Sequence, residues 1–179
     1  MKNLELLYLF VAYGMAGIMI YSTRDASFPT VSHIALNRKL TRQVFFWGLT
    51  ISAIIFAVLM YGWAIPHFGL GLRIQILVGV LVVSQILTGL FPVNNKKKFG
   101  GVHALFALCL GLCMFILITA FASTESINNF VRIFNALIAV AMVILLATSI
   151  RVPRGQYLLH EKIFFAFWHV ALFATIYFG

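Results

Sequence analysis

The chain has 179 residues, of which 63% are hydrophobic and only 9% are charged, and its formal net charge is +9. Soluble globular domains carry about 25% charged and about 45–50% apolar residues, so the composition excludes a soluble protein and indicates that lipid is the solvent. In a soluble protein this excess of basic residues would suggest nucleic acid. In a membrane protein it is typical of cytoplasmic loops near anionic lipid, and we expect no nucleic-acid partner.

Six apolar runs follow one another, and each approaches the roughly 20 residues that a helix needs to cross a membrane. Helices satisfy their own backbone in lipid, and the runs do not alternate as barrel strands would. We therefore predict an all-α fold: a polytopic membrane protein with one six-transmembrane-helix domain over residues 1–179. The predicted helices are 4–21, 44–64, 72–91, 102–121, 130–150 and 163–178.

The first helix, 4–21, is longer than the apolar segment of a signal peptide, so we expect it to be retained. Gly14 and Gly17 share one of its faces, a pattern typical of close helix packing in lipid. Proline interrupts helical hydrogen bonding, and all four prolines lie between the apolar runs, which we take as helix boundaries. These prolines are Pro29, Pro66, Pro92 and Pro153.

Three later helices each contain a polar residue: Gln85 in the third, Asn135 in the fifth and His169 in the sixth. Polar residues inside membrane helices usually face the bundle interior. We expect these three to hydrogen-bond between helices or to line a polar cavity, with Gln85 and Asn135 as candidate partners of His169. Cys109 and Cys113 are interpreted as small apolar packing residues, not as a disulfide framework.

The connections after the first, third and fifth helices hold most of the basic residues, including Lys96, Lys97 and Lys98. By the positive-inside rule these connections are cytoplasmic and both termini lie outside. We predict an integral protein of a prokaryotic cytoplasmic membrane. The lysine run favours contact with anionic lipid head groups.

An apolar-Pro step followed by a histidine recurs in the same three connections, which place His33, His103 and His160 near one membrane face. Three imidazoles can hold a transition metal and leave a position open for water. The wide, irregular spacing matches no metal-binding motif, so we predict no resident cofactor and interpret these histidines mainly as hydrogen-bonding groups. Haem ligation is not expected, because His169 has no second histidine at its depth.

Three stretches resemble the DUF998 family of small six-helix membrane proteins, which is similar to the eukaryotic DRAM/Frag-like group. They are Asp25 to Ala35, Gly89 to Val93 followed by His103 to Ala107, and Gly155 to Phe164. His33 stands where the family pattern has an acidic residue. The resemblance implies a lipid-facing role without an assigned activity, and it implies that the motif loops face outward, opposite to the charge pattern.

Neither paired carboxylates, a G-x-S-x-G motif nor a P-loop is found in the sequence. The leading hypothesis is a non-enzymatic, lipid-interacting protein whose loops close one face of the bundle. An intramembrane lipid-modifying enzyme, metal-dependent or not, and a small channel or carrier are the alternatives, and an oligomer or partner subunit stays open. The residues assigned to the loop-face cluster are Pro29, Ser32, His33, Pro92, Lys96, Lys97, Lys98, His103 and His160.

Overall fold

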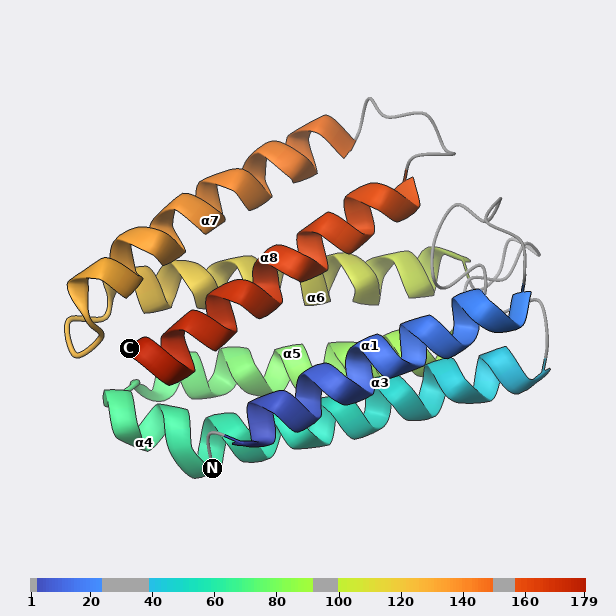
Figure 1. Ribbon diagram of the computed structural model, residues 1–179, viewed down its shortest axis with the longest axis horizontal. Coiled ribbons are helices and arrows are strands. Elements are labelled where there is room, and N and C mark those ends of the chain that lie inside the picture. Colours follow the sequence, from blue (N-terminus) through green and yellow to red (C-terminus); the bar gives the residue numbers. More distant parts are fainter. Residues whose placement is uncertain (1–2, 24–38, 92–99, 150–156) are drawn as a thin grey trace.

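The computed structural model describes residues 3–23, 39–91, 100–149 and 157–179, and these residues form helices without strands. Consecutive long helices run in opposite directions, and each packs mainly on the next along the chain (Figure 1). Both chain termini lie at one end of the bundle, here called the terminal end (Figure 1). The long helices are α1 (Asn3–Thr23), α3 (Lys39–Leu59), α5 (Leu72–Leu90), α6 (Gly100–Ser123), α7 (Asn129–Ser149) and α8 (Tyr157–Phe178).

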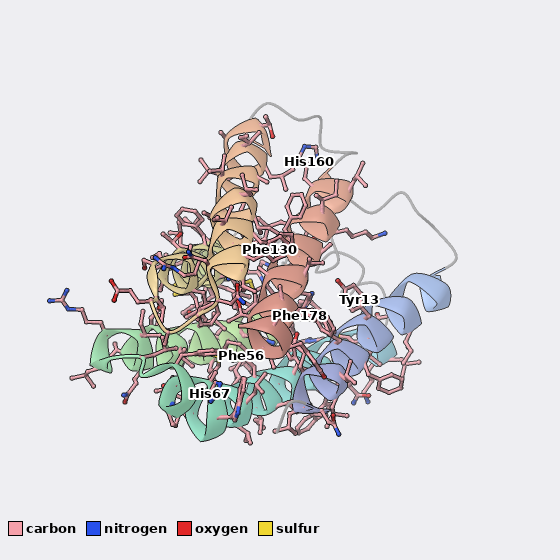
Figure 2. The ribbon with its side chains drawn as sticks, turned by 60° about the vertical axis from the view of Figure 1, so that its left-hand side comes forward. Tyr13, Phe56, His67, Phe130, His160 and Phe178 are labelled. Atoms are coloured by element: carbon pink, nitrogen blue, oxygen red, sulfur yellow. The ribbon has the colours of Figure 1, made fainter. Side chains whose placement is uncertain are left out.

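The outer surface of the bundle is apolar. Within the described residues, five helical segments are long and apolar enough to cross a membrane, which agrees with an integral membrane protein. Large apolar side chains project outward from every long helix (Figure 2), including Phe10, which is 77% exposed, and Phe130, which is 76% exposed. In α1 the fully described part, Asn3–Met15, is apolar but shorter than a membrane span, so a sixth span stays a prediction.

The second predicted helix extends beyond its apolar run at both ends: it starts at Lys39 and not at residue 44, and Pro66 does not end it. After α3 the chain continues through a π-helical turn, η1 (Met60–Ala64), into α4 (Ile65–Phe68). In this turn the Ile65 N–H donates to the carbonyl of Met60, five residues back. Proline lacks an N–H and clashes with the carbonyl four residues before it, and a π-turn widens the backbone where such a clash would occur. The predicted boundary at Pro66 is therefore wrong.

The last helix also starts earlier than predicted, at Tyr157 and not at residue 163. The polar stretch from His160 to Lys162 belongs to its first turns, because long polar side chains can reach the interface from a helix. The remaining predicted helices differ from the observed ones by one or two residues at either end. Pro29, Pro92 and Pro153 lie outside the described residues.

The terminal end is closed by short, hydrogen-bonded connections. Gly69 adopts a left-handed conformation with φ of 63° after α4, as expected for a helix C-terminus. The Ser126 hydroxyl donates to the carbonyl of Phe68 at 2.7 Å, which ties the α6–α7 connection to α4. Arg132 donates from Nε to the carbonyl of Ala122 at 3.2 Å, so its cation binds the C-terminal end of α6.

The packed core lies in the half of the bundle toward the terminal end. Phe56 of α3, Phe121 of α6 and Trp168 of α8 have no exposed surface and belong to one apolar cluster. Gly48 allows α1 to approach α3, because a Cβ there would overlap the side chain of Met15. Among the described residues, a Cβ at Gly14 or Gly17 would meet no atom within 4 Å, so no close helix contact is seen at these two glycines.

Candidate functional site

A cavity of about 870 Å³ lies in the other half of the bundle. This half leads to the basic end, where the helix ends flank segments 24–38, 92–99 and 150–156. The wall is mostly apolar and comes from α1, α3, α5, α6 and α8, with two leucines from α7. The volume falls within the roughly 300–1,000 Å³ typical of ligand pockets. The bundle is therefore solid at the terminal end and hollow toward the basic end.

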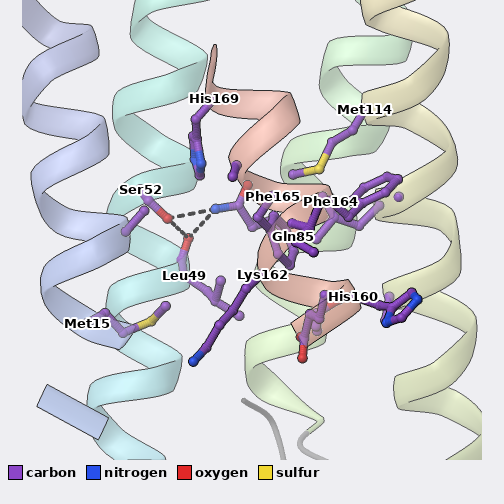
Figure 3. Close-up of a pocket in the computed structure, with 18 of the residues that line it drawn as sticks. Met15, Leu49, Ser52, Gln85, Met114, His160, Lys162, Phe164, Phe165 and His169 are labelled. Carbon is purple, nitrogen blue, oxygen red and sulfur yellow. Dashed lines mark hydrogen bonds between the residues drawn. The ribbon is translucent and has the colours of Figure 1, made fainter. Parts of the chain in front are cut away.

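The cavity surrounds the first turns of α8. Seven consecutive residues of this helix, from His160 to Ala166, line it. With 3.6 residues per turn, seven consecutive positions include every face of a helix. The rest of the wall comes from α1, α3 and α5 and also from α6 and α7, so the lining residues lie on more than one side of α8. In Figure 3 Lys162 points to the α3 side, whereas His160 and Phe164 point to the α6 side.

A hydrogen-bonded group with Gln85 at its centre forms part of the wall (Figure 3). Gln85 Nε2 donates to Ser52 Oγ at 2.7 Å and to the carbonyl of Leu49 at 3.2 Å, and Ser52 Oγ donates to the same carbonyl at 3.0 Å. These acceptors fix the orientation of the Gln85 amide, because a flipped amide would set its oxygen against the Leu49 carbonyl. Gln85 Oε1 is left buried and without a partner.

Aromatic residues of α1 and α8 meet at the deep end of the cavity. His169 Nδ1 lies 3.2 Å from the hydroxyl of Tyr13, with the donor set by the imidazole tautomer. The Trp168 indole N–H donates to the hydroxyl of Tyr8 at 3.2 Å. The His169 ring lies between the two tyrosines, with ring centroids 5.2 Å from Tyr8 and 5.1 Å from Tyr13. These contacts join α1 to α8, which otherwise touch little.

Charged and titratable groups lie where the cavity meets the basic end. His160, Glu161 and Lys162 line it in the first turns of α8. His103, near the start of α6, is buried, and its Nδ1 lies 2.8 Å from the carbonyl of Phe91 at the end of α5. His103 therefore joins two helix ends at the mouth of the cavity, and Nδ1 is engaged by the protein itself.

The structure brings together four of the residues singled out from the sequence, because Gln85, His103, His160 and His169 all line the cavity. Asn135 does not: it is fully buried between α7 and α8, where Nδ2 donates to Thr175 Oγ1 at 2.8 Å. His169 bonds to another helix as expected, but its partner is Tyr13 and not Gln85 or Asn135. The other predicted site residues lie outside the described residues: Pro29, Ser32, His33, Pro92, Lys96, Lys97 and Lys98.

Within the described ranges, no three His, Cys, Asp or Glu side chains gather closely enough to hold a metal ion. His33 lies outside these ranges, so a metal site of His33, His103 and His160 is not tested by the structure. Cys109 and Cys113 are free thiols, and Cys113 is buried in the core. The site that the described residues form is therefore an apolar cavity with a few fixed polar groups.

Two residues of this site, and one buried residue outside it, were not singled out from the sequence. Ser52 and Tyr13 hold Gln85 and His169, but isolated Ser and Tyr residues are common in membrane helices and carry no signal of their own. Glu5 in the first turn of α1 has no exposed surface, and neither carboxylate oxygen has a hydrogen-bond partner among the described residues. The signal that could have found it is its position in an otherwise apolar run.

A scan against protein-family models finds no match for the chain, and neither does a search of the curated proteins or of the solved structures. The resemblance to the DUF998 family therefore stays a prediction that rests on the three short stretches described above.

Proposed function

We propose that this protein crosses the membrane six times and binds a lipid in the cavity around the start of α8. The main observation that supports this proposal is an apolar cavity of about 870 Å³ inside a bundle whose outer surface is itself apolar. An apolar pocket with a few fixed polar groups is the usual form of a small-molecule site. In a membrane, lipid is the apolar molecule present at the highest concentration.

The walls of the cavity support lateral entry from the bilayer. Tyr13 on α1 lines the cavity and is 51% exposed, and Leu108 and Leu112 on α6 also line it although they are exposed. Side chains that face both the cavity and the outside mark places where its wall is thin. A lipid tail entering there passes only apolar groups, while its head group stays at the basic end.

The charges described at the basic end favour an anionic head group. Lys39 and Arg42 lie in the first turn of α3. Lys162 lies in α8, and its charge is offset by that of the neighbouring Glu161 in the sequence. Basic residues close to the membrane surface attract anionic lipid, at about 1 kcal/mol each. The lysine run at positions 96–98 follows α5 in the sequence and adds to the same preference.

A matched pair of alanines on α6 tests lipid binding. Ala107 is half-buried and lines the cavity, whereas Ala104, one turn earlier, is exposed and does not line it. We expect Ala107→Phe to fill part of the cavity and to remove most of the lipid that copurifies with the protein, as measured by native mass spectrometry. Ala104→Phe should keep the lipid adduct of the unsubstituted protein. Equal adducts in all three proteins would overturn the proposal.

A lipid-modifying metalloenzyme is the second candidate function, because His103 and His160 line the same cavity. Metal analysis of the same preparation separates the two, since a structural or catalytic site must be filled to act. Less than about a tenth of an equivalent of transition metal per chain rejects the enzyme that depends on metal. A stoichiometric metal lost on replacing His160 with Ala supports it.

A further inference from the structure

The shape of the cavity carries information about the ligand, and the inference drawn from it rests on the proposed lipid binding. We infer that the ligand is a lipid with two hydrocarbon chains, which straddle the first turns of α8 and place one chain on each side. The head group then lies at the basic end, near His160 and Lys162. A lipid with a single chain would leave one side of α8 empty.

The first observation behind this inference is that the cavity is divided by a helix. The residues from His160 to Ala166 all line it, so open space lies around α8 and not only along one face. On one side the opposing wall is formed by Ala12 and Met15 of α1 and by Leu49 of α3. We call this side the α1 arm.

The opposing wall on the other side is formed by Gly111 of α6 and by Leu145 and Leu146 of α7. A Cβ at Gly111 would lie 3.8 Å from the Phe164 ring, an ordinary van der Waals distance, so α6 and α8 come close at this point. We call this side the α6 arm. Since both arms belong to one continuous cavity, a branched molecule can occupy them together.

The second observation is where α8 becomes firmly held. From Trp168 onward the inward-facing residues are fully buried, including Ala171, Leu172 and Thr175. Between Trp168 and the basic end, the neighbouring helices leave space on both sides of α8. Chains inserted from the basic end would therefore run along α8 for about two turns and stop against Tyr8, Tyr13 and His169, which line the deep end of the cavity.

The gain from a second chain comes from filling space. Lipid tails are already in an apolar solvent, so transfer into the protein yields little hydrophobic free energy. An empty apolar volume inside a protein is costly, and the cost grows with its size. A two-chain lipid removes both empty arms, whereas a one-chain lipid removes one.

The test compares two probes that share a head group: dioleoyl phosphatidylglycerol and its single-chain form, oleoyl lysophosphatidylglycerol. The delipidated protein is titrated with each probe in detergent, and binding is followed by native mass spectrometry. We expect the two-chain probe to bind at least about tenfold more tightly, a difference that corresponds to filling one further arm.

Two variants then close one arm each: Ala12→Phe in the α1 arm and Gly111→Phe in the α6 arm. Either variant should still bind the single-chain probe. Its preference for the two-chain probe should fall to less than about twofold, because a second chain can no longer fill an empty arm. Ala136→Phe, on the exposed face of α7 and outside the cavity, is the control and should change neither affinity. If Gly111→Phe does not fold, Leu145→Trp closes the same arm.

The outcomes separate this inference from the proposed function. Equal binding of the two probes to the unsubstituted protein would overturn the two-chain inference and leave lipid binding intact. The two-chain inference would also be overturned if only one of the two arm variants removed the preference, since the other arm would then be unoccupied. If neither probe binds and the lipid adducts of Ala107→Phe match those of the unsubstituted protein, lipid binding itself is overturned.

Discussion

At the scale of single residues, the interior polar groups of this bundle differ in how well they are satisfied. Asn135 and Gln85 both donate from their amide nitrogen to a hydroxyl on a neighbouring helix, and both keep a buried oxygen without a partner. Only Gln85 lies in the wall of the cavity. A ligand can therefore change the surroundings of Gln85 but not those of Asn135.

Glu5 provides a prediction at this scale. Its carboxyl group is fully buried without a partner, which costs about 1–3 kcal/mol for a polar group. The first turn of a helix favours an acidic residue by about 0.3–1 kcal/mol, which offsets part of this cost. Glu5→Leu should therefore stabilise the protein by about 1 kcal/mol, read as a higher midpoint of thermal unfolding in detergent.

The isosteric variant Glu5→Gln serves as the control, since it keeps a polar group in the same place and should give little or none of this gain. A midpoint that falls in Glu5→Leu would show that the carboxyl group makes a stabilising interaction in the membrane. Glu5 would then belong to the functional groups of the protein.

The direction of the interior polar side chains follows from the sequence, but their hydrogen-bond partners do not. Gln85, Asn135 and His169 face the interior of the bundle, because each is at most 6% exposed. Polar residues in apolar runs are costly unless buried, so the sequence alone indicates their direction. Their partners could not be predicted, since Tyr13 and His169 are 156 residues apart and meet only through the packing of α1 on α8.

At the scale of helices, hydropathy located the elements but not all of their ends. Pro66 is accommodated by the π-turn from Met60 to Ala64, which depends on backbone geometry and not on composition. The first turns of α8 contain His160, Glu161 and Lys162, and these polar residues resemble a loop in a hydropathy profile although they are helical. The hydropathy profile therefore did not predict that the first residues of the α8 segment lining the cavity are helical.

The contact between α1 and α3 gives a prediction at the helix scale. A side chain at Gly48 would overlap Met15, whereas one at Gly14 would meet nothing within 4 Å. Gly48→Leu should destabilise the protein by about 1–3 kcal/mol, because overpacking forces the two helices apart. Thermal unfolding in detergent measures the change, with Gly14→Leu as the matched control.

Gly14→Leu should be neutral or slightly stabilising, because leucine is the better helix former. If both variants unfold at the same temperature, the close approach of α1 to α3 at Gly48 does not occur in the protein. The wall of the cavity that Met15 forms would then lie elsewhere.

At the scale of the whole molecule, the bundle combines a packed half with a hollow half. The connections at the terminal end are short and hydrogen-bonded, as between Ser126 and Phe68. Toward the basic end, residues in the first turns of α8 line the cavity together with residues of the other long helices. Composition predicted an integral membrane protein, but the cavity follows from the placement of α8 relative to α1 and α6, which no local pattern encodes.

The most direct measurement of the central claim is an experimental structure of the protein in lipid nanodiscs. Elongated density should occupy the cavity on both sides of α8, with its ends near the Tyr8 and Trp168 side chains and its head at the basic end beside Lys162. A continuous file of water in this space would contradict lipid binding and favour a channel or carrier. An α8 packed directly against α1 and α6, with no space between them, would contradict the cavity itself.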